Sequence, residues 1–271
     1  MHGFTELTRR RGLALVEDGS HAHGARRQGH RVGTFGSTAG FSLQQSKLLT
    51  CGEGGVAVAA SQETGRRMQQ LRANGREYDK SLRTLIDGHG AMGDNYLLGE
   101  MPAAIALTNL AHLDEENSLR HAAAQRLSAG LAHIDGVHPP VHPSGDEPGY
   151  HKYTVALDLP SFSDAPIKTL AAAVSAEVGA RCEVLDAPLS SNALYAPATS
   201  PRFKSRSDQL RVTADVHPAA SAAADRCLAF RHHLLLASNA HLDSLVEAVA
   251  KVQRHAGTLS RRPPCARLDV A

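Results

Sequence analysis

One short apolar run constrains the fold of this chain more than any other feature. Leu13-Ala14-Leu15-Val16 contains no polar residue and is followed directly by Glu17-Asp18. A continuous run of this length is typical of a strand that is buried on both faces of a parallel sheet. Further strands are predicted at Ala39–Leu43 and Gly55–Ala59, and Ser61 is a suitable N-cap for a helix that follows. This order of elements predicts an α/β architecture.

A helix pair and a loop separate the two halves of the chain. Pro102 suits the first turn of one helix, and a second helix is predicted over Asp114–His133. Gly136–Gly149 is rich in Pro, Gly and His and is predicted to be a loop, and Asn74–Asp94 and Leu185–Gln209 are expected to be irregular. The elements expected beyond residue 150 are strands Tyr153–Leu159 and His233–Ala237 and helices Ala165–Val178, Pro218–Phe230 and Leu242–His255.

This arrangement predicts two domains. Residues 1–125 are expected to form an α/β domain and residues 126–259 a smaller α+β domain. A tail over residues 260–271 is expected to be disordered. Hydrophobic residues make up 42% of the 271 residues, which is enough to build a core and excludes wholesale disorder.

Composition excludes several classes of protein. Lys and Arg number 29 against 27 Asp and Glu, whereas a nucleic-acid-binding domain usually has a strong basic excess. No apolar run approaches the length of a membrane span, and the N-terminus lacks the apolar core of a signal peptide. The four cysteines form no CxxC pair, which fits a reducing compartment better than a disulfide or zinc framework. We therefore expect a cytoplasmic protein without nucleic-acid or membrane partners.

A single lysine, Lys47, lies among the small and polar residues of Gly40–Gly55. The Gly-rich stretch Gly52–Gly55 follows it closely. A deprotonated lysine amine can form an imine with an aldehyde. The alternative is a solvated surface lysine before a tight turn, because charged side chains are mostly exposed. The segment is not a Walker A loop, since it contains no Gly-Lys-Ser/Thr sequence.

The acidic pair at the end of the first predicted strand is a second candidate site. An acid at the carboxyl end of a parallel strand faces the crevice where α/β proteins bind ligands, so Asp18 is suited to meet a cation such as a protonated ring nitrogen. The alternative is that Asp18 caps a helix or turn. His21 and His23 also suggest a zinc site, but no third ligand lies at a suitable spacing, and no metal is expected.

Together these two segments resemble the pyridoxal-phosphate sugar aminotransferases of the DegT/DnrJ/EryC1/StrS family. That family has a strand ending in Glu-Asp and then His-Gly-Ala, here Glu17-Asp18 and His23-Gly24-Ala25. It then has Phe-Ser-x-x-x-x-Lys, Gly-Glu-Gly-Gly and Asn-Tyr, here Phe41–Lys47, Gly52–Gly55 and Asn95-Tyr96. The residues of these motifs resemble in particular those of the branch that aminates scyllo-inosose-type cyclitols from glutamine.

The resemblance implies a partial large domain of the fold type I aminotransferases, followed by a small C-terminal domain. Lys47 matches the lysine that binds pyridoxal 5'-phosphate as an imine, and Asp18 matches the acid that pairs with the pyridine nitrogen. His21 matches a residue near the cofactor ring, and Ser42 a serine that contacts the phosphate. Asn95 matches an asparagine that reaches the phosphate of the partner subunit's cofactor, which implies a homodimer.

The implied reaction moves an amino group from an amino acid, glutamine or glutamate in the family, to a keto sugar or keto-cyclitol. In this reaction the amine of Lys47 acts as general base and then as general acid. The same site alternates between the amino donor and the keto acceptor, which gives ping-pong kinetics.

The sequence departs from the family pattern in two places. Family members have a long segment before the Glu-Asp strand, with a Gly-Thr helix start for the phosphate, so the chain is expected to be N-terminally truncated. Leu97 stands where the family has arginine. The alternative function is therefore an inactive remnant that acts at most as an interaction or scaffold piece. A relative that uses the cofactor for dehydration is disfavoured, because that branch has histidine in place of Lys47.

Overall fold

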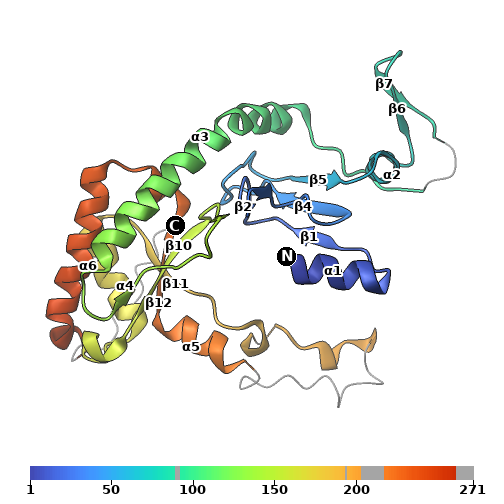
Figure 1. Cartoon of the computed structure of the whole chain (residues 1–271). Coiled ribbons are helices and arrows are strands. Elements are labelled where there is room, and N and C mark those ends of the chain that lie inside the picture. Colours follow the sequence, from blue (N-terminus) through green and yellow to red (C-terminus); the bar gives the residue numbers. More distant parts are fainter. Residues whose placement is uncertain (89–91, 193, 203–216, 261–271) are drawn as a thin grey trace. The chain divides into compact units, whose positions relative to one another are not determined.

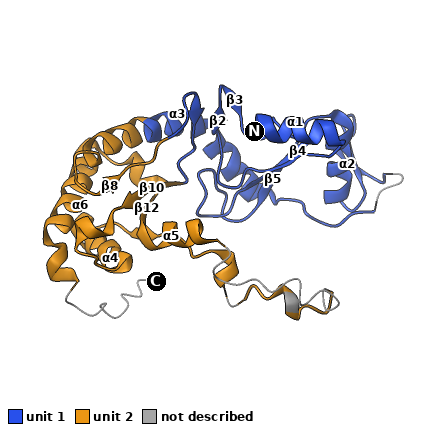
Figure 2. Ribbon diagram, turned by 60° about the horizontal axis from the view of Figure 1, so that its bottom comes forward, with its two compact units in different colours: residues 1–121, 142–151 blue, residues 122–141, 152–271 orange. Residues whose placement is uncertain are grey.

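A computed structural model describes residues 1–88, 92–192, 194–202 and 217–260 of the chain (Figure 1). The chain divides into two compact units (Figure 2). Unit 1 consists of residues 1–121 and 142–151, and unit 2 consists of residues 122–141 and 152–271.

A three-stranded sheet forms the centre of unit 1. β4 (Thr38–Ser42) lies between β1 (Val16–Asp18), to which it is parallel, and β5 (Gly55–Ala59), to which it is antiparallel (Figure 1). The register pairs Asp18 with Gly40, so β1 and β4 end at the same edge of the sheet. The residues that directly follow β1 and β4 therefore lie at this edge.

Several apolar side chains of this sheet are exposed. Val56 and Val58 of β5 are 44% and 39% exposed, and Val16 of β1 is 68% exposed. Single exposed apolar residues are normal, but neighbours on one strand form a continuous apolar surface. The sheet of unit 1 therefore carries apolar surface that the described residues do not cover.

The other elements of unit 1 surround this sheet. Ser61 caps α2 through its Oγ, which accepts a hydrogen bond from the backbone N–H of Thr64 at 3.1 Å, as predicted. The elements are α1 (His2–Arg11), α2 (Gln62–Arg72), the hairpin of β6 (Glu77–Asp79) and β7 (Thr84–Ile86), and a small sheet of β3 (His30–Arg31), β2 (Arg26–Arg27) and β9 (Asp146–Glu147).

α3 (Glu100–Leu131) is one continuous helix. The sequence predicts two helices here, with a boundary at Asp114, and this prediction is wrong. The Asp114 carboxylate does not cap a helix; it accepts hydrogen bonds from Arg31 Nη1 and Nη2 at 3.1 and 2.8 Å. Because residues 103–129 contain no Gly or Pro, the backbone continues through Asp114 without a break.

Unit 2 is built on an antiparallel sheet of four strands. Its elements are β8 (Val137–His138), β10 (Lys152–Leu157), β11 (Cys182–Val184), β12 (Cys227–Arg231), α4 (Ile167–Val178), α5 (Pro218–Arg226), α6 (Asn239–Leu259) and the 3-10 helices η1 (Leu159–Phe162), η2 (Leu189–Ser191), η3 (Pro197–Thr199) and η6 (His232–Leu236). The strand order is β11–β12–β10–β8. β10 buries every second side chain, at Tyr153, Val155 and Leu157, and α4 packs against α6. No helix in the described part of the chain is both long and apolar enough to cross a membrane.

Two predicted elements of unit 2 are wrong in type. The predicted helix over Pro218–Phe230 ends at Arg226, and Cys227–Arg231 forms β12 instead. This run is buried between β10 and β11, and a short apolar run does not distinguish a buried strand from a buried helix. The predicted strand at His233–Ala237 is the 3-10 helix η6, whose Leu234 and Leu235 are buried.

Three further predictions need correction in their bounds. The first strand begins at Val16 and continues through Asp18, so Leu13–Leu15 precede it. The stretches predicted to be irregular contain β6 and β7 in Asn74–Asp94, and β8 and β9 in Gly136–Gly149. The predicted disordered tail lies outside the described residues except for Ser260, and so does part of Leu185–Gln209.

Candidate functional site

Asp18 and Ser42 lie at the same edge of the sheet of unit 1. They are the last residues of β1 and β4, and the parallel register brings the ends of these strands together. Lys47 follows Ser42 after one tight turn, in which its backbone N–H donates to the carbonyl oxygen of Gln44 at 2.9 Å. The two motifs that the sequence singles out therefore meet at one edge.

The Asp18 carboxylate is exposed and is ionised readily. Hydrogen bonds from Ser20 lower its pKa most, one of them from the Ser20 backbone N–H to Oδ1 at 3.0 Å. The charges of His21 and Lys47 lower the pKa of Asp18 further. Asp18 thus closes a turn, as the alternative interpretation expects, and also lies within electrostatic reach of Lys47.

The segment around Lys47 is fixed by its apolar neighbours. Leu48 and Leu49 are buried, in a core cluster with Leu43, Cys51 and Leu113. The Gly-rich stretch turns the chain back, and the backbone N–H of Leu43 donates to the carbonyl oxygen of Gly54 at 2.9 Å. The turn needs glycine at residue 52, because its φ is +93°. The Lys47 side chain is half-buried, so it is not a fully solvated lysine.

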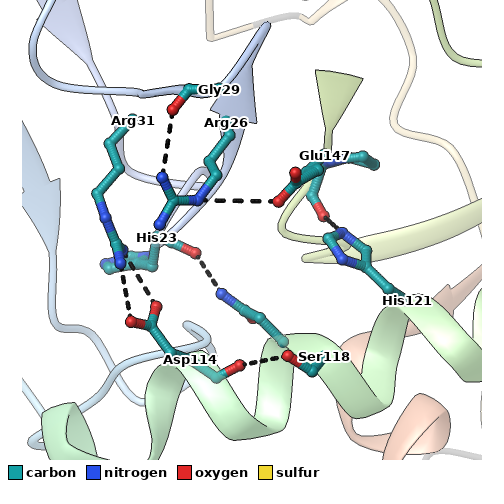
Figure 3. Close-up of polar contacts among 10 residues, drawn as sticks. His23, Arg26, Gly29, Arg31, Asp114, Ser118, His121 and Glu147 are labelled. Carbon is teal, nitrogen blue, oxygen red and sulfur yellow. Dashed lines mark hydrogen bonds and ion pairs between the residues drawn. The ribbon is translucent and has the colours of Figure 1, made fainter. Parts of the chain in front are cut away.

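Two asparagines of α3 hold the two motif segments. Asn109 Nδ2 donates to the carbonyl oxygen of Thr50 at 2.9 Å, in the lysine segment (Gly40–Gly55). Asn117 Nδ2 donates to the carbonyl oxygen of His23 at 3.1 Å, in the histidine segment (Glu17–Ala25); Figure 3 shows this carbonyl group directed toward α3. The helix therefore fixes both segments through their backbone.

His23 is a buried connection between the histidine segment and β4. Its Nε2 donates to the carbonyl oxygen of Ser42 at 2.8 Å, and its ring centroid lies 5.5 Å from that of Phe41. Burial lowers the pKa of His23, and the charges of Lys47 and His21 lower it further, so the ring is neutral at pH 7. Its Nδ1 is buried and has no hydrogen-bond partner in the described part of the chain.

His21 is exposed and stacks on His151. The ring centroids are 4.1 Å apart and the ring planes differ by 7°. Within the residues that the structure describes, no group of three His, Cys, Asp or Glu side chains is arranged to hold a metal ion.

The described contacts of Asn95 are with residues other than Lys47 and Asp18. It forms a β-bridge with Ala73, and its Oδ1 accepts a hydrogen bond from the backbone N–H of Leu97 at 3.3 Å. Its neighbours Tyr96 and Leu97, however, line the cavity described next. Asn95 is exposed.

An open cavity of about 1340 Å³ lies beside this edge of the sheet, within unit 1. Its lining includes Ser20, Phe41, Ser42, Gly55, Tyr96 and Leu97. The cavity therefore brings hydroxyl groups from both motif segments together with the segment after Asn95.

Sequence reasoning named Glu17 only as part of a motif and missed other residues that organise the site. Glu17 is buried, and its carboxylate accepts hydrogen bonds from the backbone N–H groups of residues 33, 35 and 36 at 2.9, 2.7 and 2.7 Å. Asn109, Asn117 and His151 were missed. Asn is unfavourable in a helix interior, so two Asn residues in a long helix are a signal that could have been used. Nothing in the sequence marks His151 as a partner of His21.

Comparisons with known proteins agree with the motifs. The model of the DegT/DnrJ/EryC1/StrS aminotransferase family matches residues 1–249. The L-glutamine:2-deoxy-scyllo-inosose aminotransferase of Streptoalloteichus tenebrarius is 38% identical over 262 residues, which cover 92% of this chain and 61% of that protein. The L-glutamine:scyllo-inosose aminotransferase of Streptomyces griseus is 34% identical over 272 residues, which cover 96% and 63%.

Solved structures give the same result for the fold. DesV of S. venezuelae, in complex with a ketimine intermediate, has a TM-score of 0.72 at 29% identity, over 93% of this chain and 61% of that chain. 3-Amino-5-hydroxybenzoic acid (AHBA) synthase has a TM-score of 0.70 at 27% identity, over 92% and 62%. This α/β structure thus corresponds to a part of the type I fold, and the chain spans 61–63% of the length of these four proteins. The resemblance predicted from the lysine and histidine segments is confirmed, and the chain belongs to the DegT/DnrJ/EryC1/StrS aminotransferase family.

Proposed function

We propose that this chain contributes the catalytic lysine, Lys47, and the residues around it to a pyridoxal-phosphate-dependent aminotransferase. The observation that supports it most is that Asp18 and Lys47 both follow the ends of the two parallel strands. The Lys47 side chain is half-buried, and the pKa of Asp18 is lowered mainly by hydrogen bonds from Ser20 and, to a smaller extent, by the charge of Lys47. Both lie at the carboxyl edge of a parallel strand pair, where α/β proteins bind their ligands.

The side chains at this edge fit the chemical groups of pyridoxal phosphate. An amine suits its aldehyde, a carboxylate suits its protonated ring nitrogen, and hydroxyl groups suit its phosphate. Lys47 and Asp18 supply the first two, and Ser42, whose Oγ accepts a hydrogen bond from the backbone N–H of Gln44 at 3.3 Å, supplies a hydroxyl. His21 would supply an imidazole ring near the cofactor ring. Asn95 would serve the phosphate of a partner copy in a homodimer.

Each residue then has a separate task. Asp18 stays negatively charged at neutral pH, because its pKa is held low by Ser20, and would keep a proton on the ring nitrogen. Pyridoxal phosphate, when bound, would supply a ring that withdraws electrons from the carbon that bears the amino group. Lys47 Nζ would hold the aldehyde and, once an incoming amine has displaced it, would take and return the proton at that carbon. The buried Leu48 and Leu49 limit how far Lys47 can move.

The substrates are proposed from the relatives. The Streptoalloteichus and Streptomyces griseus proteins are aminotransferases for glutamine with 2-deoxy-scyllo-inosose or scyllo-inosose. We propose glutamine or glutamate as the amino donor and a keto-cyclitol or keto sugar as the acceptor. These proteins exceed the matched region in length, so the proposal concerns the centre that this chain contributes.

A second candidate function is a binding role without catalysis. The exposed Val56 and Val58 of β5 favour it, because an apolar strand surface binds other polypeptides. The cavity beside Ser42 would then be a contact surface and not a catalytic site. The two candidates differ in whether Lys47 reacts with an aldehyde.

Reductive trapping distinguishes the two candidates. The purified chain is mixed with pyridoxal phosphate, its visible absorbance is recorded, and the complex is reduced with borohydride and digested for mass spectrometry. We expect the visible band and a phosphopyridoxyl group on Lys47. Lys47→Arg should lose both, because arginine keeps the charge but does not form an imine.

Lys80→Arg is the matched control, since Lys80 is an exposed lysine of the same unit. It should leave the band and the label on Lys47 unchanged. Labelling spread evenly over the exposed lysines, or a band that survives in Lys47→Arg, would contradict the aminotransferase proposal. A chain that gives no band at all would favour the second candidate.

A further inference from the structure

The segment of residues 148–151 lies directly against the histidine segment, within unit 1. A Cβ on Gly149 would lie 3.2 Å from the carbonyl oxygen of His23 and 3.0 Å from Leu48 Cδ1. His121 Nε2, on α3, donates to the carbonyl oxygen of Pro148 at 2.7 Å, an interaction drawn in Figure 3. Residues 148–149 are therefore held between α3 and the two motif segments.

Tyr150 has a backbone conformation that residues other than glycine rarely adopt. Its φ is +52°, in the left-handed region, which is unfavourable for a bulky residue. Its ring makes edge contacts with His121 and His142, at centroid distances of 5.4 and 5.5 Å. A strained residue persists where its surroundings determine it, and such residues cluster at functional sites. Tyr150 directly precedes His151 in the chain.

His151 stacks face to face on His21, at 4.1 Å and 7°. His21 is exposed and lies in a turn that the Ala22 N–H closes on the carbonyl oxygen of Gly19 at 2.9 Å. An exposed side chain has several rotamers, and a ring packed on one face restricts them. His151 is half-buried and follows a residue whose ring packs against His121 and His142, so it offers His21 a less mobile surface than an exposed side chain would.

We propose that His151 is a positioning residue, which fixes the plane of the His21 imidazole beside the cofactor ring. The inference rests on the proposed function, because that function gives His21 its place near the ring. A planar side chain held on one face presents its other face in a defined orientation, which suits stacking on a flat heteroaromatic ligand. His151 itself does not touch the cofactor in this scheme and takes no part in proton transfer.

The stack is tested first in the chain without cofactor. The ring protons of His21 are assigned by NMR with a His21→Gln variant and compared in His151→Ala and His151→Phe. We expect the ring-current shift of His21 to disappear in His151→Ala and to remain in His151→Phe, because phenylalanine keeps a stacking face. His112→Ala is the control, since His112 is exposed on α3, and it should leave the His21 signals unchanged.

The consequence for the cofactor is tested by titration with pyridoxal phosphate. His151→Ala should raise its Kd about fivefold, a typical loss for one aromatic pair, while His151→Phe should stay within about twofold of the unmutated chain. Melting temperatures of all variants identify any variant that fails to fold, and the Phe variant keeps the test valid in that case.

The possible failures are distinguishable. Unchanged His21 signals in His151→Ala would show that there is no stack and would overturn the proposal. Changed signals with an unchanged Kd would overturn it as well, because the stack would have no effect on the cofactor. If the unmutated chain binds no pyridoxal phosphate, the proposed function fails and the role of His151 fails with it, while the NMR result on the stack stands by itself.

Discussion

Asn117 donates a hydrogen bond from Nδ2 to the carbonyl oxygen of His23, 94 positions earlier in the chain, at 3.1 Å. Its Oδ1 also accepts a hydrogen bond from Arg120 Nη1 at 2.8 Å. All three residues are buried. One amide therefore satisfies a buried backbone carbonyl and a buried guanidinium at the same time.

Removing this amide should destabilise the chain strongly. Asn117→Ala leaves the His23 carbonyl without its donor and Arg120 without one acceptor, and each unsatisfied buried group costs about 1–3 kcal/mol. We expect a loss of about 3 kcal/mol in the free energy of unfolding, measured by urea titration. Ser118→Ala, at the next and exposed position, should lose less than about 0.5 kcal/mol. Equal urea midpoints for the two variants would contradict the role of Asn117.

Glu17→Gln should destabilise the loop that follows β3. The carboxylate accepts hydrogen bonds from three backbone N–H groups, at residues 33, 35 and 36, and an amide would turn a donor toward some of them. We expect a loss of about 2 kcal/mol in the free energy of unfolding and faster hydrogen exchange of these three amides. Glu63→Gln, on the exposed first turn of α2, should change stability by only about 0.5 kcal/mol. Unchanged exchange at residues 33–36 would argue against the prediction.

The buried His23 should make the chain sensitive to mild acid. Burial lowers its pKa below the usual value of 6.5, so the unfolded chain takes up a proton at a higher pH than the folded chain does. The contribution of neutral His23 to stability is therefore complete above pH 6.5 and decreases as the pH falls from 6.5 toward the folded pKa. The free energy of unfolding should decrease by at most about 1.4 kcal/mol per pH unit from this group.

A His23→Gln variant should reduce that slope. Urea titrations between pH 5 and 7.5 would measure it, and glutamine keeps a donor for the Ser42 carbonyl. His112→Gln, which replaces an exposed histidine of α3, should retain the slope of the unmutated chain. The assignment to His23 fails if both variants have the same pH dependence.

Cys182 should be unreactive while the chain is folded. Burial raises the pKa of its thiol to about 12, and only the thiolate reacts with alkylating agents. Iodoacetamide at pH 7.5 should modify Cys182 only after unfolding in guanidinium, as measured by mass spectrometry. Cys227 should also be protected, because burial raises its pKa. Rapid modification of Cys182 in the native chain would show that unit 2 opens at this strand.

Local signals predict part of the fold correctly. β5 agrees with the predicted strand Gly55–Ala59, and Ser61 caps α2 as expected, because both depend on a few neighbouring residues. β12 was predicted as helix, because its strand character comes from pairing with β10 and β11, far away in the chain. A break in α3 was predicted at Asp114, whose actual partner is Arg31.

The residues of the candidate site could also be predicted only in part. Asp18 and Lys47 follow from short motifs at the ends of predicted strands, and the structure brings these motifs to one edge. His151 and Asn117 contact the histidine segment from positions far along the chain, so no spacing in the sequence indicates them. The roles proposed for all five site residues remain predictions: Asp18, His21, Ser42, Lys47 and Asn95.

The two asparagines of α3 also constrain the number of residues between them. Asn109 and Asn117 are eight positions apart, which corresponds to about 12 Å along a helix, and each holds the backbone of a different motif segment. An insertion of one residue between them would lengthen this span by about 1.5 Å and rotate one amide by about 100° relative to the other. The helix would then hold only one segment at a time. This part of α3 should therefore tolerate most side-chain substitutions better than an insertion or a deletion.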